Sequence, residues 1–301
     1  MVVELVGVPF SSSGRRDGIA AAIGALRGRD LSDRLGRCAE LRDSGDLELE
    51  NQTSARAPGR LRNESGVVSL VEKTAAAVGA ALSRRSLPLL VGGDCPVILG
   101  ALAALKEHAG PPGLVMIDGH EDAYPPSISP TGEASDSELG MALGQFEDVL
   151  PEQVTRLTPL IAPERVALIG PRDRRELASY GVPSLADRVW LRSDEDLRGV
   201  GPEALAEQAC AVAGRGSRPW WLHVDLDALT SEDFPAADYL QEGGLTWTEL
   251  ELLAERLLGD PGCSGCSVAI YNPDLDPGWL SAERIVAFLA TVLGGGAVEV
   301  R

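Results

Sequence analysis

The chain has 301 residues, of which 44% are hydrophobic, and a net charge of −18 from 45 acidic and 27 basic side chains. This length is enough to bury a large core, and the negative charge argues against a nucleic-acid partner because a polyanion would be repelled. No stretch reaches the roughly 18 consecutive apolar residues that a membrane span requires, so we expect no membrane partner.

Short apolar runs alternate with amphipathic stretches along the whole chain. The first run, MVVELVGVPF, lacks the features of a signal peptide and predicts a strand in a cytoplasmic protein. Strands are expected at residues 2–8, 87–91, 114–117, 166–169, 189–191, 220–224 and 268–271. Helices are expected at 67–83, 97–107, 137–143, 202–213, 248–258 and 282–293. The alternation predicts βαβ units in a three-layer α/β/α sandwich with a mainly parallel sheet, forming a single domain over residues 1–301.

Two stretches, 43–64 and 122–136, are polar or rich in Pro, Ser and Gly, and we expect them to be loops. The five cysteines are an odd number in a long chain, which is not a disulfide framework. Two of them form the C-x-x-C string CSGC at 263–266. Without a second pair or nearby histidines, this string is a weak zinc signal, and we interpret it as two ordinary turn cysteines in preference to a redox dithiol.

Polar side chains follow four of the predicted strands at the point where each ends. The strings are GGDC at 92–95, DGHED at 118–122, DLD at 225–227 and NPDLDP at 272–277. In open parallel sheets, ligands bind beyond the carboxyl ends of the strands. The sequence therefore predicts one site built from several strand ends.

Two of these strings alternate in a way that directs their side chains to one side. Asp118, His120 and Asp122 are spaced by two residues, as are Asp225 and Asp227, and such residues share a face of an extended backbone. Carboxylates gathered in this way are prohibitively costly without a cation. Helix capping or a solvated rim explains a lone D-x-D, but two such strings favour a metal site. Oxygen-rich ligation with one imidazole suits Mn²⁺.

The ordered set of motifs resembles the ureohydrolase family, which includes arginases, agmatinases and formimidoylglutamases. The motifs are GVPFSSSG, GGDC, DGHED, IGPRD at 169–173, HVDLD at 223–227, GGLTWTEL at 243–250 and YNPDLDP at 271–277. The resemblance implies an arginase-like fold, a trimeric or hexameric homo-oligomer and a small-molecule substrate. It also implies two manganese ions whose bridging hydroxide attacks a guanidino or amidino carbon. By position, Asp118 and Asp225 would bridge the metals, His120 and Asp227 would complete one site, and Asp122 would belong to the other.

The first departure from the family is Cys95, which stands where the family has a metal-binding histidine. A thiolate is a soft ligand that favours Zn²⁺ or Fe²⁺ over Mn²⁺, so one or two bound ions both remain open. His223, two residues before Asp225, could replace the missing imidazole. The alternative is a packed, hydrogen-bonded histidine.

Further departures concern the substrate. Ile270 stands where the family has the glutamate that holds the guanidinium, and Asp274 or Asp276 could substitute for it. Arg174 and Arg175 follow IGPRD, where arginases recognise the α-amino group with an acid; a basic pair there would suit a carboxylate or phosphate. We expect substrate contacts at Glu133, Arg175 and Ile270.

The family's proton-shuttle histidine is also missing, and the equivalent region, 131–140, carries acids instead. Glu138 or Asp136 would move protons or enter the metal shell, because a desolvated carboxyl can act as an acid or base. Acids that favour a helix N-terminus explain both residues equally well.

These features predict a metal-dependent hydrolase that cleaves a C–N bond in a linear amidine or modified guanidine, other than L-arginine, through a metal-bound hydroxide. Two alternatives remain. One is a single-metal, deacetylase-like amidohydrolase on the same fold, which would need paired histidines beside the metal. The other is a catalytically weakened relative that still binds metal.

Overall fold

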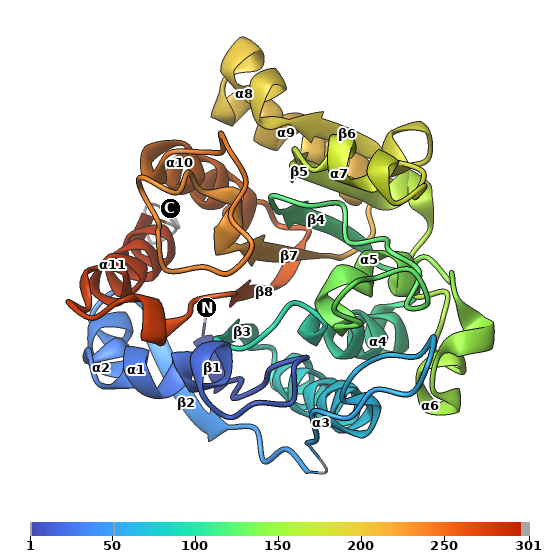
Figure 1. Ribbon diagram of the computed structural model, residues 1–301. Coiled ribbons are helices and arrows are strands. Elements are labelled where there is room, and N and C mark those ends of the chain that lie inside the picture. Colours follow the sequence, from blue (N-terminus) through green and yellow to red (C-terminus); the bar gives the residue numbers. More distant parts are fainter. Residues whose placement is uncertain (1, 51, 296–301) are drawn as a thin grey trace.

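Eight parallel strands form one sheet through the centre of the computed structural model, which describes residues 2–50 and 52–295 (Figure 1). The order across the sheet is β2-β1-β3-β8-β7-β4-β5-β6. The strands are β1 (Val2–Gly7), β2 (Glu40–Asp46), β3 (Leu87–Val91), β4 (Gly113–Ile117), β5 (Val166–Gly170), β6 (Trp190–Ser193), β7 (Trp220–Asp225) and β8 (Cys263–Ala269). The central strands β3, β4, β5 and β7 are buried along their whole length, as their apolar sequences predict.

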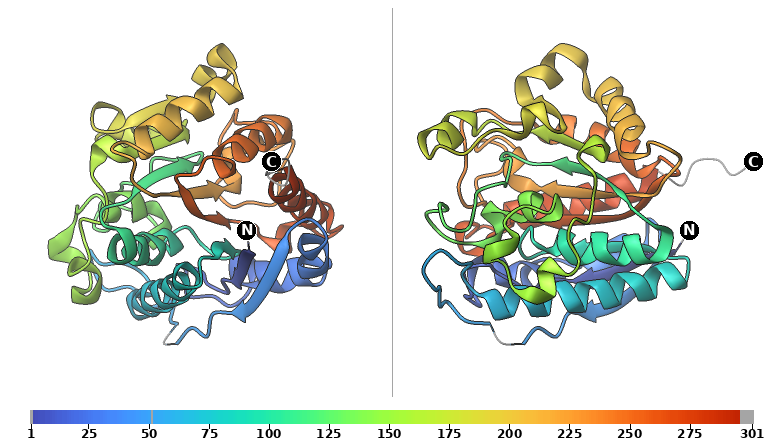
Figure 2. Two further views of the ribbon diagram at one scale, coloured as in Figure 1. Left: turned by 180° about the vertical axis from the view of Figure 1, so that it is seen from behind. Right: turned by 90° about the vertical axis from the view of Figure 1, so that its right-hand side faces the viewer.

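Helices cover both faces of the sheet (Figure 2). One layer contains α1 (Ala22–Arg27), α2 (Leu31–Gly36), α8 (Asp194–Val200), α9 (Pro202–Ala213), α10 (Trp247–Leu258) and α11 (Leu280–Gly295). The other contains α3 (Glu64–Ser83), α4 (Val97–Ala109), α5 (Glu138–Ala142) and α6 (Glu152–Thr155), and α7 (Arg174–Ser179) follows β5. The predicted three-layer α/β/α sandwich is confirmed, and the predicted helices are present with ends that differ by a few residues.

Two expectations about the strands were wrong. The stretch 43–64 was expected to be a loop, but its first residues belong to β2, an edge strand whose side chains are mostly exposed. Because an edge strand with polar side chains on both faces has no apolar periodicity, its sequence does not identify it. The two cysteines of CSGC lie in β8 and not in a turn, and both thiols are free.

Gly265 explains why a strand runs through CSGC. A Cβ atom at this position would lie 2.1 Å from Cζ3 of Trp221 on the neighbouring strand β7. Only glycine fits beneath that indole, so the residue that suggested a turn is needed for close packing between β7 and β8.

Helix α3 has the length and composition of a membrane span. In this fold, however, Val67, Leu70, Val71 and Val78 are buried in the core that α3 shares with α4. Its apolar character is therefore explained by its place in the sandwich.

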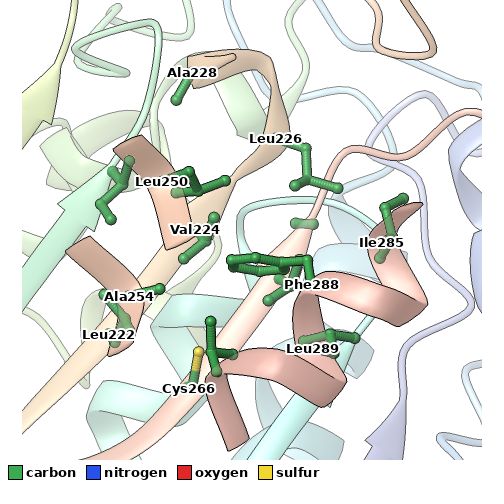
Figure 3. Close-up of a cluster of buried hydrophobic side chains, with 14 of the residues drawn as sticks. Leu222, Val224, Leu226, Ala228, Leu250, Ala254, Cys266, Ile285, Phe288 and Leu289 are labelled. Carbon is green, nitrogen blue, oxygen red and sulfur yellow. The ribbon is translucent and has the colours of Figure 1, made fainter. Parts of the chain in front are cut away.

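The register of β7 is held by a cluster of apolar side chains (Figure 3). Leu222, Val224 and Leu226 point toward α10 and α11, where they meet side chains such as Phe288 and Leu289. Because side chains alternate along a strand, this packing turns His223 to the opposite face of the sheet.

Candidate metal centre and active site

The four strands whose ends carry the polar strings are neighbours at the centre of the sheet, in the order β3-β8-β7-β4. The strings GGDC, DGHED and DLD therefore meet at one edge of the sheet, as the sequence predicts. Arg172 ties two of these strand ends together: its guanidinium donates to the carbonyl of Asp227 at 2.8 Å, and its backbone N–H donates to the carbonyl of Gly119 at 3.0 Å.

The predicted metal ligands are brought together. Three overlapping groups each place their donor atoms within 4.8 Å of one another: Asp118 with His120 and Asp122, Asp118 with Asp225 and Asp227, and Asp118 with Cys95 and His223. Asp118 belongs to all three groups and is fully buried. His223 is the one member that was not in the expected ligand set, although its spacing from Asp225 had marked it.

The donor atoms fit a divalent cation. Oδ1 of Asp118 accepts from the backbone N–H of His120 at 2.8 Å, but Oδ2 has no hydrogen-bond partner among the described residues. Burial, followed by repulsion from Asp227, raises the pKa of Asp118 well above its usual value. Burial and the neighbouring carboxylates raise the pKa values of Asp122 and Asp225 in the same way. Such a cluster of acids has the chemistry of a cation site.

His120 is the internal counter-charge when no metal is bound. Burial lowers the pKa of His120, but Oδ2 of Asp227, 3.0 Å from Nδ1, more than offsets that effect, and the pKa is raised to about 10. The second carboxylate oxygen of Asp227 accepts from the backbone N–H of Gly119 at 3.0 Å. The imidazole is thus aimed into the acidic cluster by Asp227, in the 3-10 helix Leu226–Ala228 after β7, which is itself held by Gly119 after β4.

Cys95 lies in the first turn after β3 and is buried. Its thiol donates to Oδ2 of Asp225 at 2.8 Å, while Oδ1 of Asp225 accepts from the backbone N–H of Asp227 at 2.7 Å. Burial and the nearby carboxylates raise the pKa of the Cys95 thiol well above its usual value. The thiol therefore keeps its proton and donates it to Asp225.

A cavity of about 330 Å³ opens beside these ligands. Carboxylates dominate its walls, and among the described residues no lysine or arginine lines it. The lining acids are Asp94, Asp122, Glu133, Asp136, Glu176, Asp225, Asp227 and Asp238. Asp94, Glu176 and Asp238 were not among the expected site residues, since nothing in the sequence shows which loop acids face the cavity. Such walls favour a cation.

The structure separates the three expected substrate contacts. Glu133 and Ile270 line the cavity, whereas Arg175 is exposed and is not part of its wall. The adjacent residue Glu176 lines the cavity instead, so the basic pair does not supply the positive charge that the sequence suggested. Helix α7 begins at Arg174, and its rotation decides which of these neighbours faces inward.

Asp274 and Asp276 do not replace the missing glutamate either. Asp276 accepts from the hydroxyl of Tyr271 and the backbone N–H of Ala282, both at 2.9 Å. Asp274 is exposed and accepts from the backbone N–H of Gly18 at 3.0 Å. Both acids brace loops and do not line the cavity.

The two candidate proton-transfer acids have different surroundings. Asp136 lines the cavity, and its carboxylate accepts from the hydroxyls of Thr131, at 2.6 Å, and Ser129. Glu138 is fully buried at the start of α5, and neither of its oxygens has a hydrogen-bond partner in the described part of the chain. Burial, followed by the charge of Asp118, raises the pKa of Glu138 well above its usual value.

The parallel α/β/α sandwich and the cluster of candidate metal ligands at its central strand ends are features of the ureohydrolase class of hydrolases. The chain belongs to the Arginase family, whose sequence model matches residues 2–294. It is thus a hydrolase of a family of binuclear divalent-metal enzymes that act on C–N bonds of small molecules.

The relatives match over nearly their whole length. An arginase from Bacillus caldovelox is 28% identical over 295 residues, which cover 97% of this chain and 98% of the relative. An arginase from Brevibacillus brevis is 27% identical over 299 residues, with 97% of each chain covered. The solved structure of the Bacillus caldovelox arginase has a TM-score of 0.82 at 27% identity and covers 97% of this chain and 98% of that one.

Proposed function

We propose that the protein hydrolyses a C–N bond of a cationic linear amidine or modified guanidine other than L-arginine. One observation carries this proposal: a cavity walled by carboxylates lies directly beside a buried cluster of metal-ligand side chains. Family membership supports the reaction class, and the cavity walls support the charge of the substrate.

The acidic cavity argues against L-arginine. The carboxylate of an amino acid would be repelled by the acids that line the cavity, and the only basic side chain among the described lining residues is His120, which pairs with Asp227. The exposed position of Arg175 removes the partner that the sequence suggested for an anionic substrate. A substrate whose remote end is cationic or neutral fits better, because the carboxylates that line the cavity attract positive charge.

Asp118, His120, Asp122, Asp225 and Asp227 would hold divalent ions, and their oxygen-rich set suits Mn²⁺. A divalent ion held by these residues would supply Lewis acidity and lower the pKa of a bound water. The protein's own contribution is to keep these ligands in place through the contacts of Arg172, Gly119 and Asp227.

We assign different tasks to the two acids of the 131–140 region. Asp136 lines the cavity, and Ser129 and Thr131 hold its carboxylate, so it is placed to exchange protons with a bound substrate. Glu138 does not line the cavity, and its free oxygens lie in the field of Asp118 and Asp122, so we place it in the metal shell.

The test is turnover by the purified full chain after loading with Mn²⁺, Zn²⁺ or Fe²⁺. The substrates are guanidines and amidines with cationic, neutral or anionic tails, and an acetylated amine serves as a probe for the deacetylase alternative. We expect release of urea or ammonia, fastest with cationic tails, and loss of turnover in Asp227→Asn but not in the exposed control Asp148→Asn. Acetate release, or a preference for anionic tails, contradicts the proposal. Metal binding without any turnover supports a weakened relative.

The deacetylase alternative loses support from the position of His223. Paired histidines beside an open metal would have to face the substrate, and His223 is not part of the cavity wall. Its imidazole lies instead in the group with Cys95 and Asp118.

A further inference from the structure

We propose that Cys95, Asp118 and His223 form a closed metal site beneath the cavity, in which Nε2 of His223 supplies the imidazole ligand that the family has at position 95. The site has a thiolate, an imidazole and a carboxylate, and it favours Zn²⁺ over Mn²⁺. This inference rests on the metal dependence within the proposed function but not on the reaction or its substrate.

The three donor atoms are close enough to share one ion. A ring nitrogen of His223, Sγ of Cys95 and a carboxylate oxygen of Asp118 lie within 4.8 Å of one another. Zinc binds sulfur at about 2.3 Å and nitrogen or oxygen at about 2.0–2.2 Å, so ligand atoms around one zinc lie within such a distance of each other. Asp225, whose Oδ2 is 2.8 Å from Sγ of Cys95, stands next to this group as a further oxygen donor.

The sheet fixes the orientation of His223. It pairs with Met116 on β4 and with Ser267 on β8, and the apolar packing of Leu222 and Val224 holds β7 in this register (Figure 3). Nδ1 of His223 lies 2.7 Å from Oγ of Ser267, and Nε1 of Trp221 donates to that Oγ at 2.9 Å. A ligand histidine characteristically donates its second ring N–H to such an acceptor, which leaves Nε2 free to bind a metal.

The atoms that would bind the ion lack other partners. Nε2 of His223 and Oδ2 of Asp118 are buried and have no hydrogen-bond partner among the described residues, and both side chains are fully buried. Without a shared ion, Nε2 of His223 and Oδ2 of Asp118 would both stay unsatisfied, and burying an unsatisfied polar atom costs free energy. One shared cation satisfies both atoms, and the Cys95 proton would leave to solvent on binding.

This site differs from the rest of the cluster in its access. His120, Asp122, Asp225 and Asp227 line the cavity, whereas Cys95, Asp118 and His223 do not. Closed sites with sulfur and nitrogen ligands are typical of zinc, and sites that keep an open position are typical of catalysis. The inferred ion would therefore support the floor of the cavity, and Asp118 would link it to the ligands that face the substrate.

The primary test is X-ray absorption at the zinc edge on the unmutated full chain, loaded with one equivalent of Zn²⁺ after metal removal. We expect a sulfur scatterer at about 2.3 Å together with imidazole scattering. Co²⁺ in place of Zn²⁺ is expected to give a thiolate charge-transfer band, which Cys95→Ser removes. A spectrum with only oxygen and nitrogen neighbours overturns the inference, and this measurement does not depend on any variant folding.

Variants test the role of His223 directly by metal titration and stoichiometry. His223→Ala is expected to lose this ion. Ser267→Ala removes the hydroxyl that Nδ1 of His223 shares with Nε1 of Trp221, and it is expected to weaken binding by roughly 10- to 100-fold. The exposed His108→Ala is the matched control and should bind as the unmutated chain does. The double variant Cys95→His/His223→Ser should recover the ion without the charge-transfer band. Unchanged stoichiometry and affinity in His223→Ala overturn the inference.

Failure of this inference is distinct from failure of the proposed function. A chain that hydrolyses amidines but shows no sulfur ligand retains the function and loses the zinc site. A chain with the sulfur and imidazole ligands but no turnover on any substrate retains the site and loses the function.

Discussion

Nδ1 of His120 lies 3.0 Å from Oδ2 of Asp227, and this pair joins the loop after β4 to the 3-10 helix Leu226–Ala228 that follows β7. The pair is the shorter of two contacts between His120 and an acid of the cluster: the pKa of His120 is raised to about 10, and Oδ1 of Asp118 lies 3.8 Å from the same Nδ1. Asp118 has only this longer contact, and Asp122 and Asp225 form no ion pair with a described residue; this imbalance underlies the first prediction.

Asp118→Asn should stabilise the metal-free protein and remove its response to metal. Asp118 is fully buried, its Oδ2 is unpaired, and it belongs to every candidate ligand group. Asparagine has no charge, so the substitution removes the cost of burying a carboxylate and its repulsion by Asp227. We therefore expect a gain of roughly 1–3 kcal/mol in unfolding free energy with chelator present. Urea unfolding with and without Mn²⁺ or Zn²⁺ measures both effects. The exposed Asp148→Asn should change neither, and a metal-induced stabilisation that survives in Asp118→Asn contradicts the ligand assignment.

Glu133→Gln should alter how stability depends on pH. Burial, followed by repulsion from Asp94 and Asp136, raises the pKa of Glu133 to about 7 in the folded protein. The folded state therefore holds the proton more tightly, and wild-type stability falls as pH rises from about 4.5 to 7. Glu133 keeps partial exposure, so we expect Glu133→Gln to gain roughly 1–2 kcal/mol at pH 8 and nothing at pH 4.5.

Chemical unfolding of the metal-free protein at a series of pH values measures this difference. The exposed Glu147→Gln is the matched control, and its unfolding free energy should depend on pH in the same way as that of the wild type. A constant difference between Glu133→Gln and the wild type across the series would show that the residue does not titrate as described.

Ile270→Glu should improve the use of guanidinium substrates. Ile270 lines the cavity at the end of β8, where the family carries a glutamate, and it adopts a φ of 69°, which is unusual for a β-branched residue. A carboxylate there offers a charge-assisted hydrogen bond worth roughly 1.5–3 kcal/mol, or about a tenfold to hundredfold gain in kcat/KM. Steady-state kinetics on a guanidine measure this gain in kcat/KM, and a neutral amide serves as the uncharged comparison substrate. Ile270→Gln, which has the same shape without the charge, should give little of this gain; an equal gain would point to relief of backbone strain.

Arg56→Ala should loosen the loop that forms one wall of the cavity. The Arg56 guanidinium donates to the carbonyls of Pro126 and Ser129, both at 2.8 Å, and of Pro130 at 3.2 Å, and it lies against Gly132. We expect a loss of about 2 kcal/mol in stability and faster hydrogen exchange in residues 126–132. Arg56→Lys keeps the charge but not the planar fork and should recover only part of the protection. Exchange that rises equally throughout the protein would indicate global destabilisation.

The sequence was most informative where buried strands end in ligand-type side chains. The apolar runs of β3, β4 and β7 predicted their own burial, and the i, i+2 spacing of Asp118, His120 and Asp122 predicted that these ligands would share a side. The burial of these strands follows from their continuous apolar sequences, which are a local property. The ligand strings lie beyond the strand ends, where the backbone is not extended: Asp122 has a φ of 43°, and Asp227 lies in the 3-10 helix Leu226–Ala228. The turns after the strands, and not the period of an extended chain, therefore bring these ligands together. The meeting of separate strings followed from the rule that parallel strands end at one edge of the sheet.

What the tertiary structure alone decided concerns contacts between segments that are distant in the chain. The polar edge strand β2 is defined by its pairing with β1, and CSGC became part of a strand because Gly265 fits under Trp221. The rotation of α7 placed Glu176, and not Arg175, in the cavity wall. The free Nε2 of His223 follows from the contact of Nδ1 with Ser267, on the neighbouring strand β8. A local period specifies the face to which a side chain points, but the partner on that face depends on packing between elements that the period does not encode.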